Sequence, residues 1–179
     1  MNLISMMANL GENEKAAKMA VLLSDYYRYN MSNLDSLVTV QQELKHAEGY
    51  LEIQKIRYVE KLAYDISADE CIFDIKMPSQ LLQPIVENAI EHGIEKRQEN
   101  GIIKIEAKKS ENNIEICVRD NGYGFDKCFE ESKGVGLTNT DQRIKYYYGN
   151  SYGVSMVRQD GFTKVCIKFP FKKEGDNNL

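Results

Sequence analysis

The strongest constraint on the fold is a change in hydrophobic periodicity near residue 60. Before this point the chain has no proline, and its apolar residues recur every three or four positions, which is typical of amphipathic helices. Beyond it, short apolar runs alternate with polar residues, which is typical of strands. The change therefore predicts three parts: a helical segment at 1–60, an α+β domain at 61–172 and a flexible tail at 173–179.

The helical segment is predicted to begin with two helices, or one helix broken at Gly11, over 3–10 and 16–27, and to continue with a helix at 40–58. Thr39, followed three positions later by Gln42, has the form of a capping box and predicts the start of the third helix at residue 40. One face of that helix is predicted to be buried, and it carries Leu44, Ala47, Leu51 and Gln54.

The aromatic and histidine side chains of this segment are expected to have structural roles and not to form a binding or catalytic site. Tyr26, Tyr27 and Tyr29 recur at helical spacing, which favours a packing stripe or a subunit contact over a cofactor site. His46 has charged neighbours and is expected on the surface. Neither feature is a candidate site.

The second half combines short strands with two further helices. One helix is predicted at 79–94, and another follows Gly136 and runs through Tyr148. Strands and helices do not alternate as a regular βαβ repeat, so we predict a two-layer α/β sandwich, a mixed sheet with helices on one face. The predicted strands are 62–66, 72–75, 102–107, 114–118, 153–158 and 164–169, with a hairpin turn at 111–113.

Composition narrows the class of protein. Lys and Arg number 23 and Asp and Glu number 27, so the formal net charge of −4 does not favour a nucleic-acid partner. No apolar run reaches about 18 residues and the start does not resemble a signal peptide, so we expect a chain that neither spans a membrane nor is secreted. The four cysteines are far apart and form no CxxC pair, which favours reduced thiols over a zinc site. Cys117 and Cys166 are expected as small buried side chains.

The first cluster of polar residues lies on the predicted helix at 79–94. Leu82, Ile85 and Ala89 share its core face, and Asn88 and His92 stand one turn apart on the adjacent face. The carbonyl oxygen of an Asn suits Mg²⁺, which takes its other ligands from water and phosphate. By itself the pattern is a weak signal.

Two glycine-rich clusters follow. Asp120 precedes Gly122 and Gly124, so a carboxylate that can accept a hydrogen bond from an exocyclic amine stands beside backbone that a ligand can approach closely. Gly134 and Gly136 lead into the next helix, a usual geometry for binding phosphate on backbone amides. The Walker sequence GxxxxGK[ST] is absent.

In order and spacing, the three clusters resemble the N box, G1 box and G2 box of the GHKL superfamily of ATP-binding domains, which have the Bergerat type of mixed sheet. More closely, segments 82–94, 120–124 and 134–149 look like the C-terminal part of sensor histidine kinases of the YesM/LytS type. Segments 23–30 and 38–58 are similar to that subfamily's stretch between phosphoacceptor and ATP-binding domain. The resemblance covers nearly the whole chain except the tail.

The resemblance implies a site for ATP and Mg²⁺. Asn88 would ligate the Mg²⁺ that bridges the phosphates, and Asp120 would bond the adenine amino group. Glu87 would either reach the γ-phosphate or orient an incoming imidazole, and Arg143 would be a structural ion-pair partner. The segment 125–133 would be the ATP lid. The remaining ATP-binding residues implied are His92, Gly122, Gly124, Lys133, Gly134, Gly136, Leu137 and Thr163.

The chain departs from the family pattern in two respects. Family members carry a Gly-Thr pair on the last strand, whereas here Phe162 separates Gly161 from Thr163. The family's phosphoacceptor histidine is also missing, because neither His46 nor His92 sits in its motif. The resemblance thus implies a fragment that binds ATP and transfers the γ-phosphate to a histidine outside the sequence.

Phosphoryl transfer is favoured over hydrolysis. GHKL ATPases such as gyrase and MutL usually have a Glu where this chain has Pro84, which cannot act as a base. The resemblance further implies a homodimer, a response regulator as phosphate recipient, a cytoplasmic position and a membrane anchor in the full-length protein. The alternatives are a GHKL ATPase, a serine kinase of the anti-sigma type, or a non-catalytic dimerisation module with a degenerate ATP site.

Overall fold

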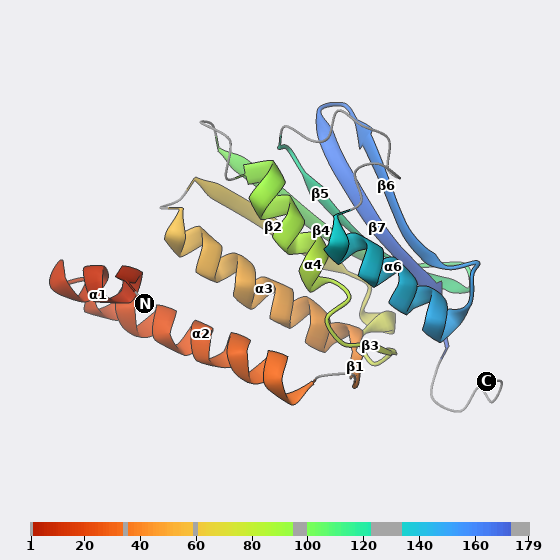
Figure 1. Cartoon of the computed structure of the whole chain (residues 1–179), viewed down its shortest axis with the longest axis horizontal. Helices are drawn as coiled ribbons and strands as arrows, with labels where there is room; N and C mark the ends of the chain where they lie inside the picture. The colour runs from red at the N-terminus through yellow and green to blue at the C-terminus, as the bar shows by residue number, and fades with distance from the viewer. Residues whose placement is uncertain (1, 34–35, 59–60, 95–99, 123–133, 173–179) are drawn as a thin grey trace.

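The fold is a five-stranded sheet covered on one face by helices, with a further pair of N-terminal helices outside them (Figure 1). The sheet and its helical cover confirm the predicted mixed α/β architecture. The computed structural model describes residues 2–33, 36–58, 61–94, 100–122 and 134–172.

The N-terminal part forms three helices, α1 (Asn2–Asn9), α2 (Asn13–Ser32) and α3 (Val40–Arg57). The predicted capping box at the start of α3 is confirmed. The hydroxyl of Thr39 accepts the backbone N–H of Gln42 at 3.1 Å, and the Gln42 side chain accepts the backbone N–H of Thr39 at 2.8 Å. Two donors that the helix cannot satisfy are thereby paired.

The large sheet has the strand order β2-β4-β5-β7-β6. Strand β2 (Leu62–Ala68) runs parallel to β4 (Gly101–Ser110), and the other neighbours are antiparallel. The remaining strands are β5 (Asn113–Asp120), β6 (Gly153–Gln159) and β7 (Phe162–Pro170). Strand β5 is therefore central and bonded on both sides.

The predicted strand at 72–75 is wrong. The chain forms the 3₁₀ turn η1 (Glu70–Ile72) there, and Ile72 and Ile75 are buried all the same. An apolar run indicates that its side chains are buried, and a short turn packed on the core can bury them as well as a strand can. Just beyond it, β3 (Lys76–Pro78) pairs antiparallel with β1 (Leu37–Thr39), a small sheet that the sequence analysis did not predict.

The helix predicted at 79–94 is shorter and has two parts. It begins as the α-helix α4 (Gln83–Asn88) and continues as the π-helical segment η2 (Ala89–Ile94). With α3 and α6 (Val135–Tyr148), these elements lie over one face of the sheet (Figure 1). The largest fully buried side chains of the core they enclose are Leu51, Leu62, Ile72, Met77, Leu81, Leu82, Ile85, Ile90, Ile103, Ile105, Ile114 and Phe169.

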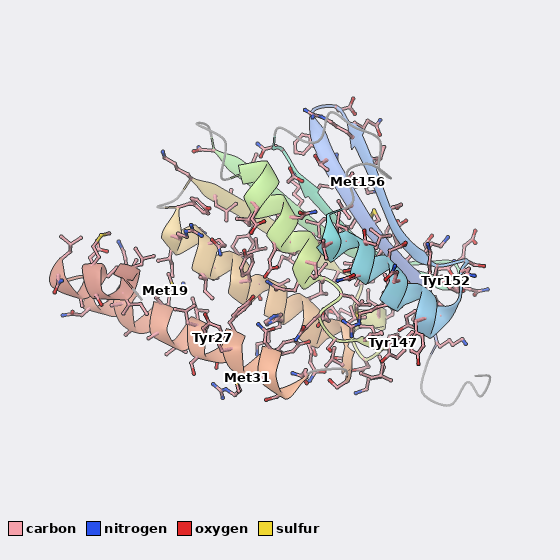
Figure 2. All side chains as sticks on the ribbon, in the orientation of Figure 1. Met19, Tyr27, Met31, Tyr147, Tyr152 and Met156 are labelled. Carbon is pink, nitrogen blue, oxygen red and sulfur yellow. A yellow bond between two sulfur atoms is a disulfide. The ribbon has the colours of Figure 1, made fainter. Side chains whose placement is uncertain are left out.

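Helix α3 belongs to this same core, because the predicted face with Leu44, Ala47 and Leu51 is buried in it. Helix α2 packs on the other side of α3, where Tyr27 and Met31 are 61% and 77% exposed (Figure 2). The division of the chain near residue 60 stays a prediction. Within the described ranges, no helix is both long and apolar enough to cross a membrane.

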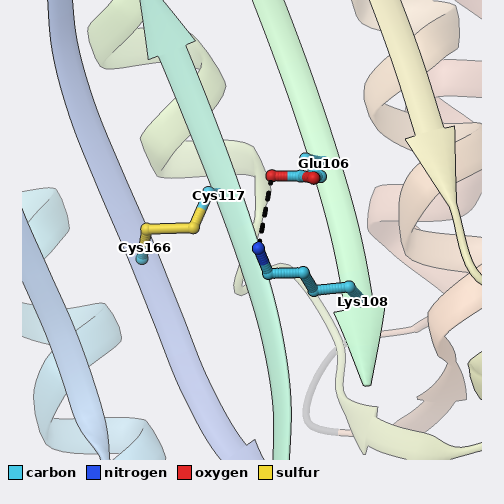
Figure 3. The surroundings of a disulfide bond; sticks show 4 residues. All are labelled: Glu106, Lys108, Cys117 and Cys166. Atoms are coloured by element: carbon cyan, nitrogen blue, oxygen red, sulfur yellow. Dashed lines mark ion pairs between the residues drawn. A yellow bond between two sulfur atoms is a disulfide. The ribbon is translucent and has the colours of Figure 1, made fainter. Parts of the chain in front are cut away.

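The opposite face of the sheet carries a disulfide between Cys117 and Cys166 (Figure 3). These residues are partners in the register of β5 and β7, with Cα atoms 4.1 Å apart, beside the ion pair of Lys108 with Glu106. The expectation of separate reduced thiols is therefore wrong for this pair, because only the strand register brings them together. Glu115 lies nearby, but bonded sulfurs offer no thiolate to a metal.

Candidate functional site

The best-defined part of the predicted site is the end of the central strands. Asp120 closes β5, and Thr163 lies directly opposite it near the start of β7. The two side chains are 5% and 3% exposed. Opposed residues of an antiparallel pair project to the same face, and here that is the face covered by helices. A carboxylate and a hydroxyl thus stand side by side in a sheltered position.

The turn after Asp120 is held in place by side chains. One carboxylate oxygen of Asp120 accepts the backbone N–H of Gly122 at 2.9 Å. The Asn121 side chain accepts the backbone N–H of Ile102 at 2.7 Å and donates to the carbonyl of Asn100 at 3.2 Å. The turn is therefore fixed to the start of β4, which gives Asp120 a defined direction.

Asn88 is the last residue of α4, and it is half-buried. The helix widens to the π form at the next residue, a change that often occurs at functional sites. His92 lies on the π-helical segment, and its side chain is outside the described residues. The neighbouring Glu87 is half-buried, and its carboxylate accepts a hydrogen bond from Gln83 at 2.8 Å and one from Tyr26 at 3.2 Å.

The N-terminus of α6 lies next to α4. Gly134 is its N-cap and supplies no capping side chain, so it leaves first-turn amides available for another acceptor. A Cβ at Gly136 would lie 3.4 Å from the Cβ of Pro84, so the two helices are in close contact here. Leu137, by contrast, is 1% exposed and packs in the core.

The structure places Asp120, Gly122 and Thr163 together at one end of the sheet, and Gly136 beside Pro84 of α4. Gly124, Lys133 and the predicted lid at 125–133 lie outside the described residues. Arg143 is a structural residue, and its described contact is a hydrogen bond to the carbonyl of Ser79 at 2.9 Å rather than an ion pair.

A buried carboxylate behind α4 was missed. Glu43 of α3 is 1% exposed and accepts hydrogen bonds from the Tyr29 hydroxyl at 2.6 Å and from the backbone N–H groups of Gln80 and Leu82 at 2.7 and 3.2 Å. Burial raises the pKa of Glu43, and these donors oppose that rise. The sequence contains a pattern that predicts this burial, because Glu43 lies one turn before Ala47 on the apolar face of the helix.

The expectation that His46 is a surface residue is wrong. It is 7% exposed because α2 covers this side of α3, and its ring stacks against those of Tyr26 and Tyr29 at centroid distances of 5.0 and 4.1 Å. Burial lowers the pKa of His46 to about 4. Two of the three predicted packing tyrosines are thus in this cluster, whereas Tyr27 is exposed.

Two parts of the sequence match known protein families. Residues 73–173, more than half of the chain, match the family described as histidine kinase-, DNA gyrase B-, and HSP90-like ATPase. The chain belongs to this ATPase family. Residues 1–62 match a second family, described as histidine kinase. The predicted resemblance to sensor histidine kinases is confirmed.

Relatives of this ATPase-family chain include two sensor histidine kinases. The chain is 29% identical to BtsS of Escherichia coli K12 over 164 residues, covering 91% of the chain and 29% of BtsS. It is 30% identical to YesM of Bacillus subtilis 168 over 175 residues, covering 96% of the chain and 30% of YesM. The chain therefore spans less than a third of the length of these relatives.

Solved histidine kinase structures share the ATPase-family fold. Acinetobacter baumannii AdeS superposes with a TM-score of 0.60 at 16% identity, covering 94% of this chain and 84% of that chain. The catalytic domain of the histidine kinase ThkA superposes with a TM-score of 0.58 at 18% identity, covering 76% of this chain and 95% of that chain. At these identities the likeness establishes the fold alone.

Proposed function

We propose that this chain is the catalytic ATP-binding part of a sensor histidine kinase. It would bind ATP with Mg²⁺ and pass the γ-phosphate to a histidine of the full-length protein. The observation that carries the proposal is the buried pair of Asp120 and Thr163 at the end of the central strands of an ATPase-family sheet. A sheltered acceptor beside a hydroxyl suits the amino group and ring nitrogen of adenine.

The phosphate end would lie between α4 and the start of α6. The half-buried amide of Asn88 supplies an oxygen of the kind that Mg²⁺ prefers, and the ion would neutralise charge on the phosphates when bound. The uncapped first turn of α6 offers backbone amides to the same phosphates. The further ligands that we propose are His92, Gly122, Gly124, Lys133, Gly134, Gly136 and Leu137, the last through its backbone.

Transfer to a histidine is favoured over hydrolysis. Pro84 stands one turn before Asn88, packs near Gly136 and offers no group that could activate water. Glu87 is the nearest carboxylate in sequence to Asn88, and we propose that it orients an incoming imidazole or accepts its proton. A neutral imidazole is already a nucleophile, so positioning and charge neutralisation are the main tasks of the site.

The wider assembly is also a proposal. We propose a homodimer, a phosphoacceptor histidine on the full-length protein and a response regulator that receives the phosphate. The histidine kinase ThkA, 15% identical to this chain, has been solved in complex with the response regulator protein TrrA. We further propose a cytoplasmic position and, in the full-length protein, an anchor in the membrane.

Calorimetric titration with a non-hydrolysable ATP analogue tests the proposal. The chain should bind the analogue more tightly with Mg²⁺ than without it, and Asp120→Asn should abolish binding. Asp65→Asn, on the exposed side of β2, is the matched control and should bind normally. Absence of binding by the unaltered chain, or equal binding by Asp120→Asn, would refute an ATP site here.

A further inference from the structure

A side-chain bridge joins the outer helix α2 to the helix that ends at Asn88. The hydroxyl of Tyr26 donates to the carboxylate of Glu87 at 3.2 Å. The side-chain amide of Gln83, one turn earlier on α4, donates to the same carboxylate oxygen at 2.8 Å and to the Tyr26 hydroxyl at 3.2 Å. The three side chains form a closed triangle that spans two helices.

The bridge is sheltered by aromatic rings. Tyr26 stacks on His46 and lies 5.8 Å, between ring centroids, from Tyr50 of α3. Burial raises the pKa of Tyr26, and the charge of Glu87 raises it further. The phenol therefore stays protonated and able to donate at any ordinary pH. Hydrogen bonds to a charged acceptor in such surroundings are stronger than those in water.

Glu87 and Asn88 are consecutive, so their side chains leave the helix about 100° apart. Fixing the direction of one therefore fixes the rotation of the turn that carries the other. The direction of the Asn88 side chain needs such a constraint because the backbone changes from α to π directly after this residue. A segment at the junction of two helix types has more than one available pitch.

We infer that Tyr26 is a positioning residue for the proposed Mg²⁺ site: through Glu87 it holds the last turn of α4 so that Asn88 faces the phosphates. The inference rests on the proposed function. The inference couples α2 to the site, since a shift of α2 that withdraws the phenol would leave Glu87 held only by Gln83 of its own helix and would loosen the Mg²⁺ ligand. The adenine end, on β5 and β7, has no part in the bridge.

The test separates the two ends of the nucleotide. The dissociation constant of the ATP analogue is measured with and without Mg²⁺, and the ratio of the two values reports the Mg²⁺ site. Tyr26→Phe keeps the ring on His46 and removes only the hydroxyl. It should reduce this ratio by about three- to tenfold, while the dissociation constant without Mg²⁺ changes by less than about twofold.

Three further variants distinguish the bridge from a general structural effect. Tyr27→Phe removes the hydroxyl of the adjacent, exposed tyrosine and should leave the ratio unchanged. Glu87→Ala should lower the ratio as Tyr26→Phe does, and the double variant should lose no more than either alone, because both remove one bridge.

Each outcome is decisive. A normal ratio in Tyr26→Phe, or fully additive losses in the double variant, overturns the inference while the ATP site stands. Equal losses of affinity with and without Mg²⁺ overturn it as well, because they indicate general loosening. If the unaltered chain shows no Mg²⁺-dependent binding, the proposed function itself fails.

Discussion

Thr163 lies directly across from Asp120 in the antiparallel pair of β5 and β7, although 42 residues separate them along the chain and Phe162 interrupts the expected Gly-Thr sequence. The register, and not the adjacent glycine, decides which residue faces Asp120. Both side chains are buried on the helix-covered face. The departure at Phe162 therefore leaves the hydroxyl next to the carboxylate.

This pairing predicts a contribution of the Thr163 hydroxyl to nucleotide affinity. Thr163→Val has nearly the same shape and lacks the donor and acceptor, so it should weaken binding of the ATP analogue about five- to tenfold, as expected for one hydrogen bond. Thr163→Ser restores the hydroxyl and should recover most of the affinity in the same titration. Equal affinities in all three proteins would contradict a contact with the nucleotide.

Burial of His46 predicts a loss of stability in mild acid. Its pKa of about 4 lies below the ordinary value of 6.5, so the unfolded chain takes up a proton that the folded chain does not. The contribution is complete above pH 6.5 and is lost as the pH falls toward about 4, a change of about 1–3 kcal/mol in the free energy of unfolding. Urea denaturation at several pH values measures it.

His46→Phe should flatten this part of the pH profile. The Nε2 atom of His46 has no hydrogen-bond partner in the described part of the chain, so a phenyl ring loses no hydrogen bond at that atom. Lys45→Met changes the exposed neighbouring side chain and should keep the acid slope. A profile of His46→Phe that parallels the unaltered chain between pH 4 and 6.5 would rule out this histidine as the cause.

Gly153 and Gly49 should respond to alanine in opposite directions. Gly153 has φ = +152°, and a Cβ there would collide with the Asp141 carboxylate, which accepts the backbone N–H of Val154 at 2.9 Å. Gly153→Ala should therefore cost about 2–3 kcal/mol in unfolding free energy. Gly49 lies inside α3 with open space around it, so Gly49→Ala should add about 0.5–1 kcal/mol. Chemical denaturation of the two variants measures both changes, and a change of the same sign in both would contradict the prediction.

The disulfide predicts sensitivity of the fold to reduction. The bond between Cys117 and Cys166 closes a loop with a sequence separation of 49, and loss of such a cross-link costs about 2–4 kcal/mol. Denaturation with and without dithiothreitol measures the difference. A chain with both residues changed to Ala should unfold identically in the two conditions, and an unaltered chain that is indifferent to dithiothreitol would show that the bond is not formed in solution.

Local patterns were sufficient for much of the fold. The capping box at Thr39 and Gln42 and the apolar face through Leu44 and Leu51 involve residues within a turn or two of each other, so the sequence displays them directly. The apolar run around Ile72 was misleading because it reports burial and not backbone shape.

Contacts between residues far apart in the sequence could not be predicted. The cover that α2 places over His46 and the register that joins Cys117 to Cys166 depend on how distant elements pack. In the site, the sequence indicated Asn88 and Asp120 through short motifs. It gave no indication of the bridge from Tyr26, because that bridge links residues 61 positions apart.

The central position of β5 has a consequence for synthesis of the chain on the ribosome. Its partner β7 emerges only after β5, so a nascent chain that ends before Phe162 carries β5 with one edge open. Asp120 would already have been synthesised, but Thr163, the residue that faces it, would not. The adenine end of the proposed site therefore forms only after β7 has been synthesised, and until then the open edge of β5 is exposed to pairing with other strands.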